Sequence, residues 1–376
     1  VEVSQVHLMA DSEAVGTAGV SLLERFLAHG AAACRVKVPT VTDPRSVDPK
    51  LCHSMKQPRE AAEREDRIAA SLSGMGAMLT QTCINYQTIL PPLKGEHIAF
   101  GDTGSVIYAN SVCGARSNFE GGSAALWAAL TGRVPRYGYH LDRVRRGNRH
   151  FVLAFQPESL TDWGAIGGLV GRQMRNYWDV PVLSGLERSP TSDALKHLGA
   201  ALASYGSTPM FHLVGVTPEA PDVETVFDGP PPPAQVIDRA ALDGFFESFN
   251  QDDGAVDLVV FSAPQLSLFE LEALAELLDG RKISERTAVF ATTSPENASA
   301  ASRFGLLDRI TGSGARVIEG TCFYQMYARE IGEANGWKRL ATNSAKLANI
   351  ISGYGYDPVL LPMDRCVDVA VKGKLV

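Results

Sequence analysis

Short apolar runs and amphipathic stretches alternate along the whole chain. Runs rich in β-branched residues predict strands, and these are 1–8, 34–38, 150–155, 287–292 and 315–319. Stretches with apolar residues at helical spacing predict helices, and these are 19–29, 60–74, 123–130, 161–174 and 344–351. The alternation continues at 192–205, 210–216, 257–262 and 268–278, with short, apolar segments expected to be buried at 97–100 and 105–108. This pattern predicts an α/β fold.

The length of 376 residues is enough for two or three domains. Residues 162–318 contain βα units of their own between Cys113 and Cys322, so the chain is expected to leave the functional site and return to it. The expected units are a first α/β lobe (1–160, carrying Cys83 and Cys113), an inserted α/β lobe (161–318) and a C-terminal segment (319–376). Because clefts between lobes often bind ligands, we expect the site there.

Composition narrows the functional classes. Hydrophobic residues make up 45% of the chain and charged residues 20%, as in ordinary globular enzymes. The net charge of -7 argues against a nucleic-acid or membrane-surface partner, and no apolar run approaches the roughly 18 residues of a membrane helix. Six cysteines in so long a chain predict a reducing compartment, the cytoplasm. Because the sequence opens without Met inside an expected strand, we expect a longer polypeptide.

Three of the cysteines lie in polar, glycine-flanked surroundings where a loop could present a thiol to a metal: Cys83, Cys113 and Cys322. Thiolates suit iron and iron–sulfur clusters, although spacings of this length match no local metal motif. Cys34 and Cys366 are expected to be packed small hydrophobes. For Cys52, beside His53, both a structural and a site role stay open.

Two polar segments are suited to a small anion. Residues 110–118 place two amides, two hydroxyls and an arginine around Cys113, a set that is costly to bury unless every group is satisfied. Gly121–Ser123 opens a helix that either binds a carboxylate or simply begins with a serine cap. Thr342–Lys346 places a lysine in the first turn of a helix, where the helix dipole disfavours it. That mismatch favours an anion-binding Lys346.

Two further patterns carry weaker signals. The basic cluster of Arg143, Arg145, Arg146 and Arg149 is typical of a solvated face, with phosphate binding as the alternative. Gly164–Gly171 lacks the preceding strand and the later acidic residue of a dinucleotide fingerprint, so that function is excluded.

Together these segments resemble the large subunit, or large domain, of the aconitase X family. The matching segments are 82–86, 95–99, 108–122, 129–133, 138–141, 320–322 and 342–346. The resemblance implies a multi-lobed α/β/α aconitase-like architecture with the active site in a cleft, and a lyase that removes water from a hydroxylated carboxylate. It also implies iron held by cysteines, as a [2Fe-2S] cluster or a mononuclear ion, and a small swivelling subunit or fused domain that closes the site.

The family's known substrates are cis-3-hydroxy-L-proline in bacteria and mevalonate 5-phosphate in archaea. This sequence departs from the family at Cys83–Tyr86, where relatives often show Cys-Thr-Pro-Tyr, and at Ser262–Gln265, where they often show Gly-Cys-Pro-His. The second departure removes a possible ligand and a possible proton carrier. A third thiol at Cys113, where many relatives have leucine, favours a cysteine triad and hydroxyproline as substrate.

The resemblance thus implies a hydro-lyase that converts cis-3-hydroxy-L-proline into a pyrroline-2-carboxylate. The metal ligands would be Cys83, Cys113 and Cys322; the substrate-binding residues would be Asn110, Ser111, Arg116, Asn118, Ser344 and Lys346. Ser344 and Lys346 would be catalytic, Lys346 as the base if desolvation lowers its pKa; otherwise the base comes from the small domain. The alternatives are a mevalonate 5-phosphate dehydratase, with phosphate bound near Arg145, a non-catalytic iron or redox sensor, and a metal-free binding module.

Overall fold

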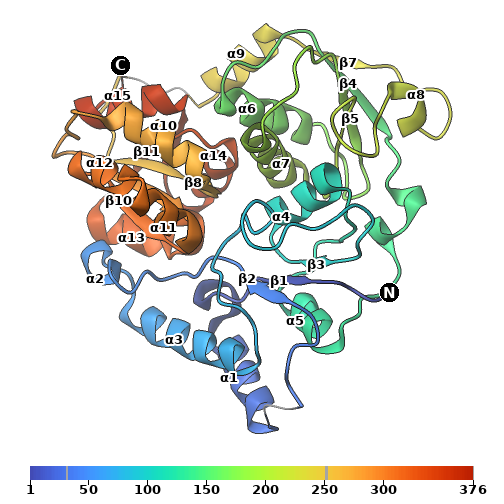
Figure 1. Ribbon diagram of the computed structural model, residues 1–376. Helices are drawn as coiled ribbons and strands as arrows, with labels where there is room; N and C mark the ends of the chain where they lie inside the picture. Colours follow the sequence, from blue (N-terminus) through green and yellow to red (C-terminus); the bar gives the residue numbers. More distant parts are fainter. Residues whose placement is uncertain (31–32, 250–252, 376) are drawn as a thin grey trace.

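The computed structural model describes residues 1–30, 33–249 and 253–375. Its strands form three separate sheets, and every pair of strands within them is parallel. Each sheet, with the helices around it, makes one domain; in Figure 1 they are blue to cyan, green to yellow, and orange to red. The expected α/β class is therefore observed.

The first domain is built on the sheet β2-β1-β3. Its elements are β1 (Val6–Leu8), α1 (Ser12–Ala28), β2 (Thr40–Thr42), α2 (Cys52–Met55), α3 (Arg59–Gly74), β3 (Ala99–Phe100), α4 (Thr103–Tyr108), the π-helix η1 (Ala109–Cys113), α5 (Gly122–Thr131) and the 3₁₀ turns η2 (Gly138–His140) and η3 (Asp142–Val144). Asp11 caps α1 and Asp102 caps α4 with their carboxylates, which satisfies free backbone N–H groups at each helix start.

The second domain is built on the sheet β6-β5-β4-β7. Its elements are β4 (Arg149–Leu153), α6 (Leu160–Gly171), β5 (Pro181–Ser184), α7 (Ser192–Gly206), β6 (His212–Leu213), α8 (Val223–Val226), β7 (Gln235–Ile237) and α9 (Arg239–Glu247).

The third domain is built on the sheet β10-β9-β8-β11-β12. Its elements are β8 (Leu258–Leu266), α10 (Leu268–Leu278), β9 (Ala288–Thr293), α11 (Pro295–Arg303), α12 (Leu306–Gly312), β10 (Arg316–Glu319), η4 (Phe323–Gln325), α13 (Ala328–Asn335), β11 (Arg339–Thr342), α14 (Ala345–Ile351), η5 (Ser352–Tyr354), β12 (Asp357–Leu360) and α15 (Met363–Lys372).

The chain passes from the first sheet to the second between β3 and β4, and from the second to the third between β7 and β8. The lobes expected from the sequence divide instead after residues 160 and 318. The difference arises at the C-terminal end. There β11 and β12 pair beside β8, so the returning segment completes a sheet that begins near residue 258.

Two local expectations differ from the structure. The strand expected at 34–38 lies instead at Thr40–Thr42, where the chain pairs with β1. Val36 and Lys37 are not in this strand because their backbone N–H groups donate to carbonyls at the C-terminal ends of α3 and α5. The helix expected from residue 19 begins at Ser12, where Asp11 provides the cap.

The glycine-rich segment Gly164–Gly171 serves helix packing. A Cβ on Gly167 would lie 2.4 Å from the Leu198 carbonyl oxygen, and one on Gly168 would lie 2.4 Å from the Phe245 ring. Only glycine lets α6 approach α7 and α9 this closely. The segment therefore holds the second-domain core together.

Helix α7 contacts all three domains. It packs on α6 within its own domain, on α4 of the first domain, and on α14 and β8 of the third. In Figure 1 these helices gather around the middle of the molecule, where the three domains meet. The residues discussed next lie at this junction.

Candidate active site

The structure brings two of the three expected thiols together. Cys83 lies in the loop before β3 and Cys322 follows the end of β10 by three residues, and the two buried thiols lie close enough to shift each other's pKa. The interaction with Cys322 and burial raise the pKa of Cys83. The interaction with Cys83 and the nearby Lys346 ammonium lower the pKa of Cys322 against the opposing effect of burial. This arrangement favours the thiolate form at Cys322 over that at Cys83.

Lys346 forms a buried ion pair with Asp102 beside the thiols. Its Nζ lies 3.3 Å from the Asp102 Oδ1, and the Asp102 Oδ2 accepts a hydrogen bond from the Ser105 N–H at the start of α4. Burial lowers the pKa of Lys346, but the charges of Asp102, Cys83 and Cys322 outweigh it and raise the pKa above the ordinary value. This raised pKa favours the ammonium form of Lys346 and argues against the expectation that desolvation makes it a base.

The first-domain strands place more titratable groups here. His7 lies in β1 with its Nε2 3.4 Å from the Asp43 Oδ1, and Asp43 directly follows β2. Burial and the neighbouring Asp102 carboxylate raise the pKa of Asp43, although the Gln325 side-chain N–H donates to it at 3.0 Å. The Lys346 ammonium lowers the pKa of Asp102 against burial. The site therefore favours the protonated form of Asp43 and the ionised form of Asp102, and carboxyl groups with pKa values shifted in opposite directions are typical of acid–base sites.

Sequence reasoning missed His7, Asp43 and Asp102. In parallel sheets, ligands bind beyond the carboxyl ends of the strands. Asp43 follows β2 and Asp102 follows β3 after one residue, so this rule was the signal that could have found them. It failed because the second strand was expected at 34–38, which left Asp43 in a loop far from any strand end.

Cys113 is not part of the thiol pair in this structure. It ends the π-helix η1, a kind of element frequent at functional sites. Burial raises its pKa to about 11, and no other group contributes to that shift. The charge of Cys83 raises the pKa of Tyr86, and the charge of Cys113 raises the pKa of Tyr108. The rings of Tyr86 and Tyr108 stack with centroids 4.1 Å apart. The place of Cys113 in a metal triad stays a prediction.

The other expected substrate-binding side chains have internal partners. Asn110 donates to the carbonyls of Ser117 and Pro209, and the Ser111 hydroxyl accepts from the Phe211 N–H. Arg116 pairs with Asp142 and donates to the His140 carbonyl. Asn118 bonds to the backbone of Tyr137 and Tyr139. These four residues therefore shape the loop around η1, and their role in substrate binding is untested.

The Ser344 hydroxyl also forms hydrogen bonds within the chain. Its hydroxyl donates to the Ala263 carbonyl and accepts from the Leu347 N–H, which caps α14. This cap fixes the first turn of α14, and that turn carries Lys346 into the junction of the three domains.

Several buried polar atoms around the thiols have no hydrogen-bond partner within the described residues: His7 Nδ1, Asp43 Oδ1, Asn85 Oδ1 and Nδ2, Gln265 Oε1, Thr321 Oγ1 and Gln325 Oε1. Buried polar atoms are normally hydrogen-bonded, so such a set indicates a place for a bound group. Two thiols with oxygen donors beside them fit a thiophilic metal such as iron. Within residues 1–30, 33–249 and 253–375, no three His, Cys, Asp or Glu side chains are already arranged to hold a metal ion.

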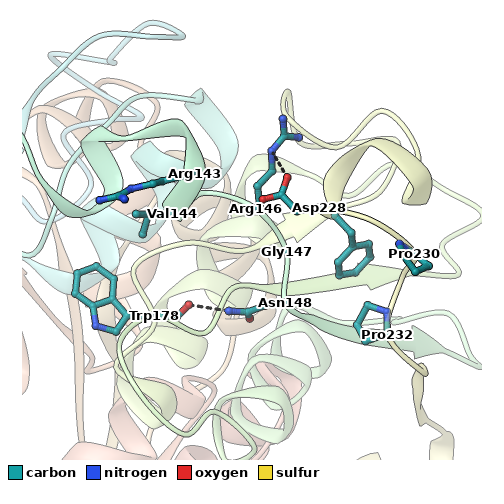
Figure 2. Close-up of a pocket in the computed structure, with 10 residues that line it drawn as sticks. Arg143, Val144, Arg146, Gly147, Asn148, Trp178, Asp228, Pro230 and Pro232 are labelled. Carbon is teal, nitrogen blue, oxygen red and sulfur yellow. Dashed lines mark hydrogen bonds and ion pairs between the residues drawn. The ribbon is translucent and has the colours of Figure 1, made fainter.

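The basic cluster does not converge on one anion. Arg145 is buried and its Nε bonds to both carboxylate oxygens of Glu219, at 3.0 and 3.1 Å. Figure 2 shows a surface pocket of about 540 Å³ lined by Arg143 and Arg146, in which Arg146 faces Asp228 at 3.4 Å. Arg149 pairs with Asp179. Carboxylates therefore compensate three of the four arginines, which argues against a phosphate site at Arg145.

The carboxyl group of the half-buried Glu65 gives a test of the electrostatics of the first domain. Glu65 accepts hydrogen bonds from the N–H groups of Ser12 and Ser46, and burial raises its pKa from 4.5 to about 7. Between these pH values the folded chain binds a proton that the unfolded chain has released. The free energy of unfolding therefore falls as pH rises, by up to about 3 kcal/mol.

We expect Glu65→Gln, which keeps both accepted hydrogen bonds, to raise the free energy of unfolding by about 1–3 kcal/mol at pH 8 and to change little at pH 4.5. Urea unfolding at both pH values measures this, with the exposed Glu63→Gln as control. An equal effect at both pH values would mean that the Glu65 carboxyl group is not shifted.

The chain matches known proteins along its whole length. Sequence models of the aconitase X first, second and third domains match residues 1–143, 147–247 and 256–372. The chain is 34% identical to the phosphomevalonate dehydratase large subunit of Methanothermobacter thermautotrophicus, over 96% of this chain and 86% of the relative. It is 33% identical to the cis-3-hydroxy-L-proline dehydratase of Pseudomonas aeruginosa, over 100% of this chain but only 64% of the relative.

The crystal structure of aconitase X from Thermococcus kodakaraensis, in its holo-form, has a TM-score of 0.87 and 27% identity, over 98% of this chain and 90% of that one. Fold and relatives define a dehydratase, that is a hydro-lyase, of the aconitase class. The chain belongs to the aconitase X family. The family and the enzyme class expected from the sequence are thereby confirmed.

The name "large subunit" implies a small-subunit partner in some members. No helix within the described ranges is long and apolar enough to cross a membrane.

Proposed function

We propose that this chain is the large part of a cytoplasmic, iron-dependent dehydratase that converts cis-3-hydroxy-L-proline into a pyrroline-2-carboxylate. A small swivelling subunit or fused domain would complete the site. The names of the relatives support two substrates, hydroxyproline and phosphomevalonate, at nearly equal identity. The choice between them rests on the charge of the site.

The single observation that carries this choice is the buried Lys346–Asp102 ion pair beside the thiols, in which Asp102 balances the Lys346 ammonium. Lys196, whose ammonium donates to the Gln265 carbonyl, is likewise paired with Asp193 and Glu270. His7 is neutral because burial lowers its pKa. A substrate with both a carboxylate and a phosphate brings about three negative charges, which are costly to bury without matching cations. Hydroxyproline brings one carboxylate and one ammonium group, which the Lys346–Asp102 pair complements.

The residues of the chain then have distinct roles. Iron, as a [2Fe-2S] cluster or a mononuclear ion, would act as a Lewis acid on the leaving hydroxyl. Cys83 and Cys322 would hold it, with Cys113 as the proposed third ligand. Lys346 would bind the substrate carboxylate, with Ser344 beside it, and Asp102 would keep that ammonium group oriented.

Asp43 would supply the proton that converts the departing hydroxyl into water, since burial and the Asp102 carboxylate raise the pKa of its carboxyl group. The base that removes the proton from the carbon next to the carboxylate would belong to the small domain, because the surrounding anionic groups raise the pKa of Lys346 against burial. One proton leaves the substrate carbon and one reaches the hydroxyl, so the net products are the unsaturated acid and water.

The test supplies the complete enzyme, purified without oxygen, with each substrate in turn. We expect water elimination from cis-3-hydroxy-L-proline and none from mevalonate 5-phosphate. Turnover of the phosphate compound alone would establish the alternative dehydratase. Bound iron without turnover of either substrate would favour a sensor, and a lack of iron would leave a binding module.

A further inference from the structure

Gln265 occupies the position where the family often carries histidine, and its contacts place it between the two thiols. It lies near the end of β8 and is fully buried. Its backbone N–H donates to the Cys83 sulfur at 3.5 Å. Its side chain reaches the two loops that carry Cys83 and Cys322.

The side-chain amide of Gln265 joins three carbonyl groups. Its Nε2 lies 3.2 Å from the Gln81 oxygen, 3.0 Å from the Thr321 oxygen and 3.3 Å from the Thr293 oxygen. Gln81 precedes Cys83 by two residues and Thr321 immediately precedes Cys322. Because all three neighbours are acceptors, the amide nitrogen must face them, which also fixes the position of Oε1. One amide group thus holds the backbone on both sides of the thiol pair.

A buried ion network holds Gln265 from the other side. The Lys196 ammonium on α7 donates to the Gln265 carbonyl oxygen at 3.2 Å. It also pairs with Asp193 on α7 and with Glu270 on α10, and His197 donates to the same Glu270 carboxylate at 2.7 Å. These groups lie in the interface between the second and third domains. They fix the backbone of Gln265 independently of the thiol loops.

We propose that Gln265 is a positioning residue for the metal-binding thiols: it sets the separation and orientation of Cys83 and Cys322. The inference rests on the proposed function in so far as the thiol pair binds a metal. Outer contacts of this kind commonly change metal affinity 10–100-fold when they are removed.

The test measures Cd²⁺ binding to the reduced, metal-free protein through cadmium–thiolate ultraviolet absorption, which does not depend on turnover. We expect Gln265→Met to weaken Cd²⁺ binding about 10–100-fold. Gln265→Asn, which keeps an amide but is too short to span all three carbonyls, should weaken it in the same direction and is the milder change for folding.

Gln57→Met is the matched control. Gln57 is also buried, and its Nε2 also joins two carbonyl groups, those of Ser46 and Met326, at 2.8 and 3.0 Å. Its Oε1 likewise has no partner among the described residues. This variant should lose stability as Gln265→Met does, yet bind Cd²⁺ as the wild type does.

Two outcomes contradict the inference in different ways. Tight Cd²⁺ binding by the wild type that neither Gln265 variant changes would show that Gln265 only stabilises the fold. A wild-type protein that does not bind Cd²⁺ would refute the metal site of the proposed function, and the inference with it.

Discussion

Alanine at Cys83 or at Cys322 is expected to abolish both bound iron and turnover in the complete enzyme. The two buried thiols lie close enough to shift each other's pKa, and a metal bound by thiolates loses a strong ligand with each substitution. Iron and acid-labile sulfide per chain, measured on protein purified without oxygen, give the first readout. Elimination of water from the substrate gives the second.

Cys113→Ala separates a thiol triad from a thiol pair. If Cys113 is the third ligand, as proposed, this variant loses iron like the other two. Cys366→Ala is the control, because that thiol is fully buried in the third-domain core and donates a hydrogen bond to the Leu361 carbonyl. Iron retained in Cys113→Ala alone would reduce the ligands to the pair. Full iron in all three site variants would exclude cysteine ligation altogether.

Much of the fold could be predicted because its signals are local. Helices such as α3, α7 and α10 carry amphipathic patterns, and their observed bounds lie close to the expected segments. α7 and α10 also begin with side-chain caps, at Thr191 and Ser267. The short strands of the first domain were harder to locate. Three residues, as in β2, give too little pattern to distinguish Thr40–Thr42 from the apolar run just before it.

The site was predictable only where one residue carried the signal. Lys346 violated the helix-dipole preference, which identified it, but whether it is a base or a cation depends on Asp102, 244 residues away in sequence. The polar groups of the loop around Asn110 bond to one another, a role that the sequence did not indicate. Which polar residues converge is decided by the packing of three domains, and no spacing in the sequence reports that.

The Lys346–Asp102 pair leads to the second large prediction. Lys346→Met should lower kcat/KM of the complete enzyme by about 10²–10³-fold, since it removes the charge that is proposed to bind the substrate carboxylate. It also leaves the Asp102 carboxylate buried without its partner. Breaking a buried pair from one side costs about 3–5 kcal/mol of unfolding free energy, and urea unfolding measures this.

The double variant Lys346→Met/Asp102→Asn distinguishes binding from stability. Asparagine still caps α4 well, and no unpaired charge is left at this pair. We therefore expect the double variant to recover most of the lost unfolding free energy while kcat/KM stays as low as in Lys346→Met. Recovery of activity together with stability would show that the pair only supports the fold. In that case the substrate carboxylate would have to be bound by a residue outside the pair, and the argument from charge for hydroxyproline would lose its basis.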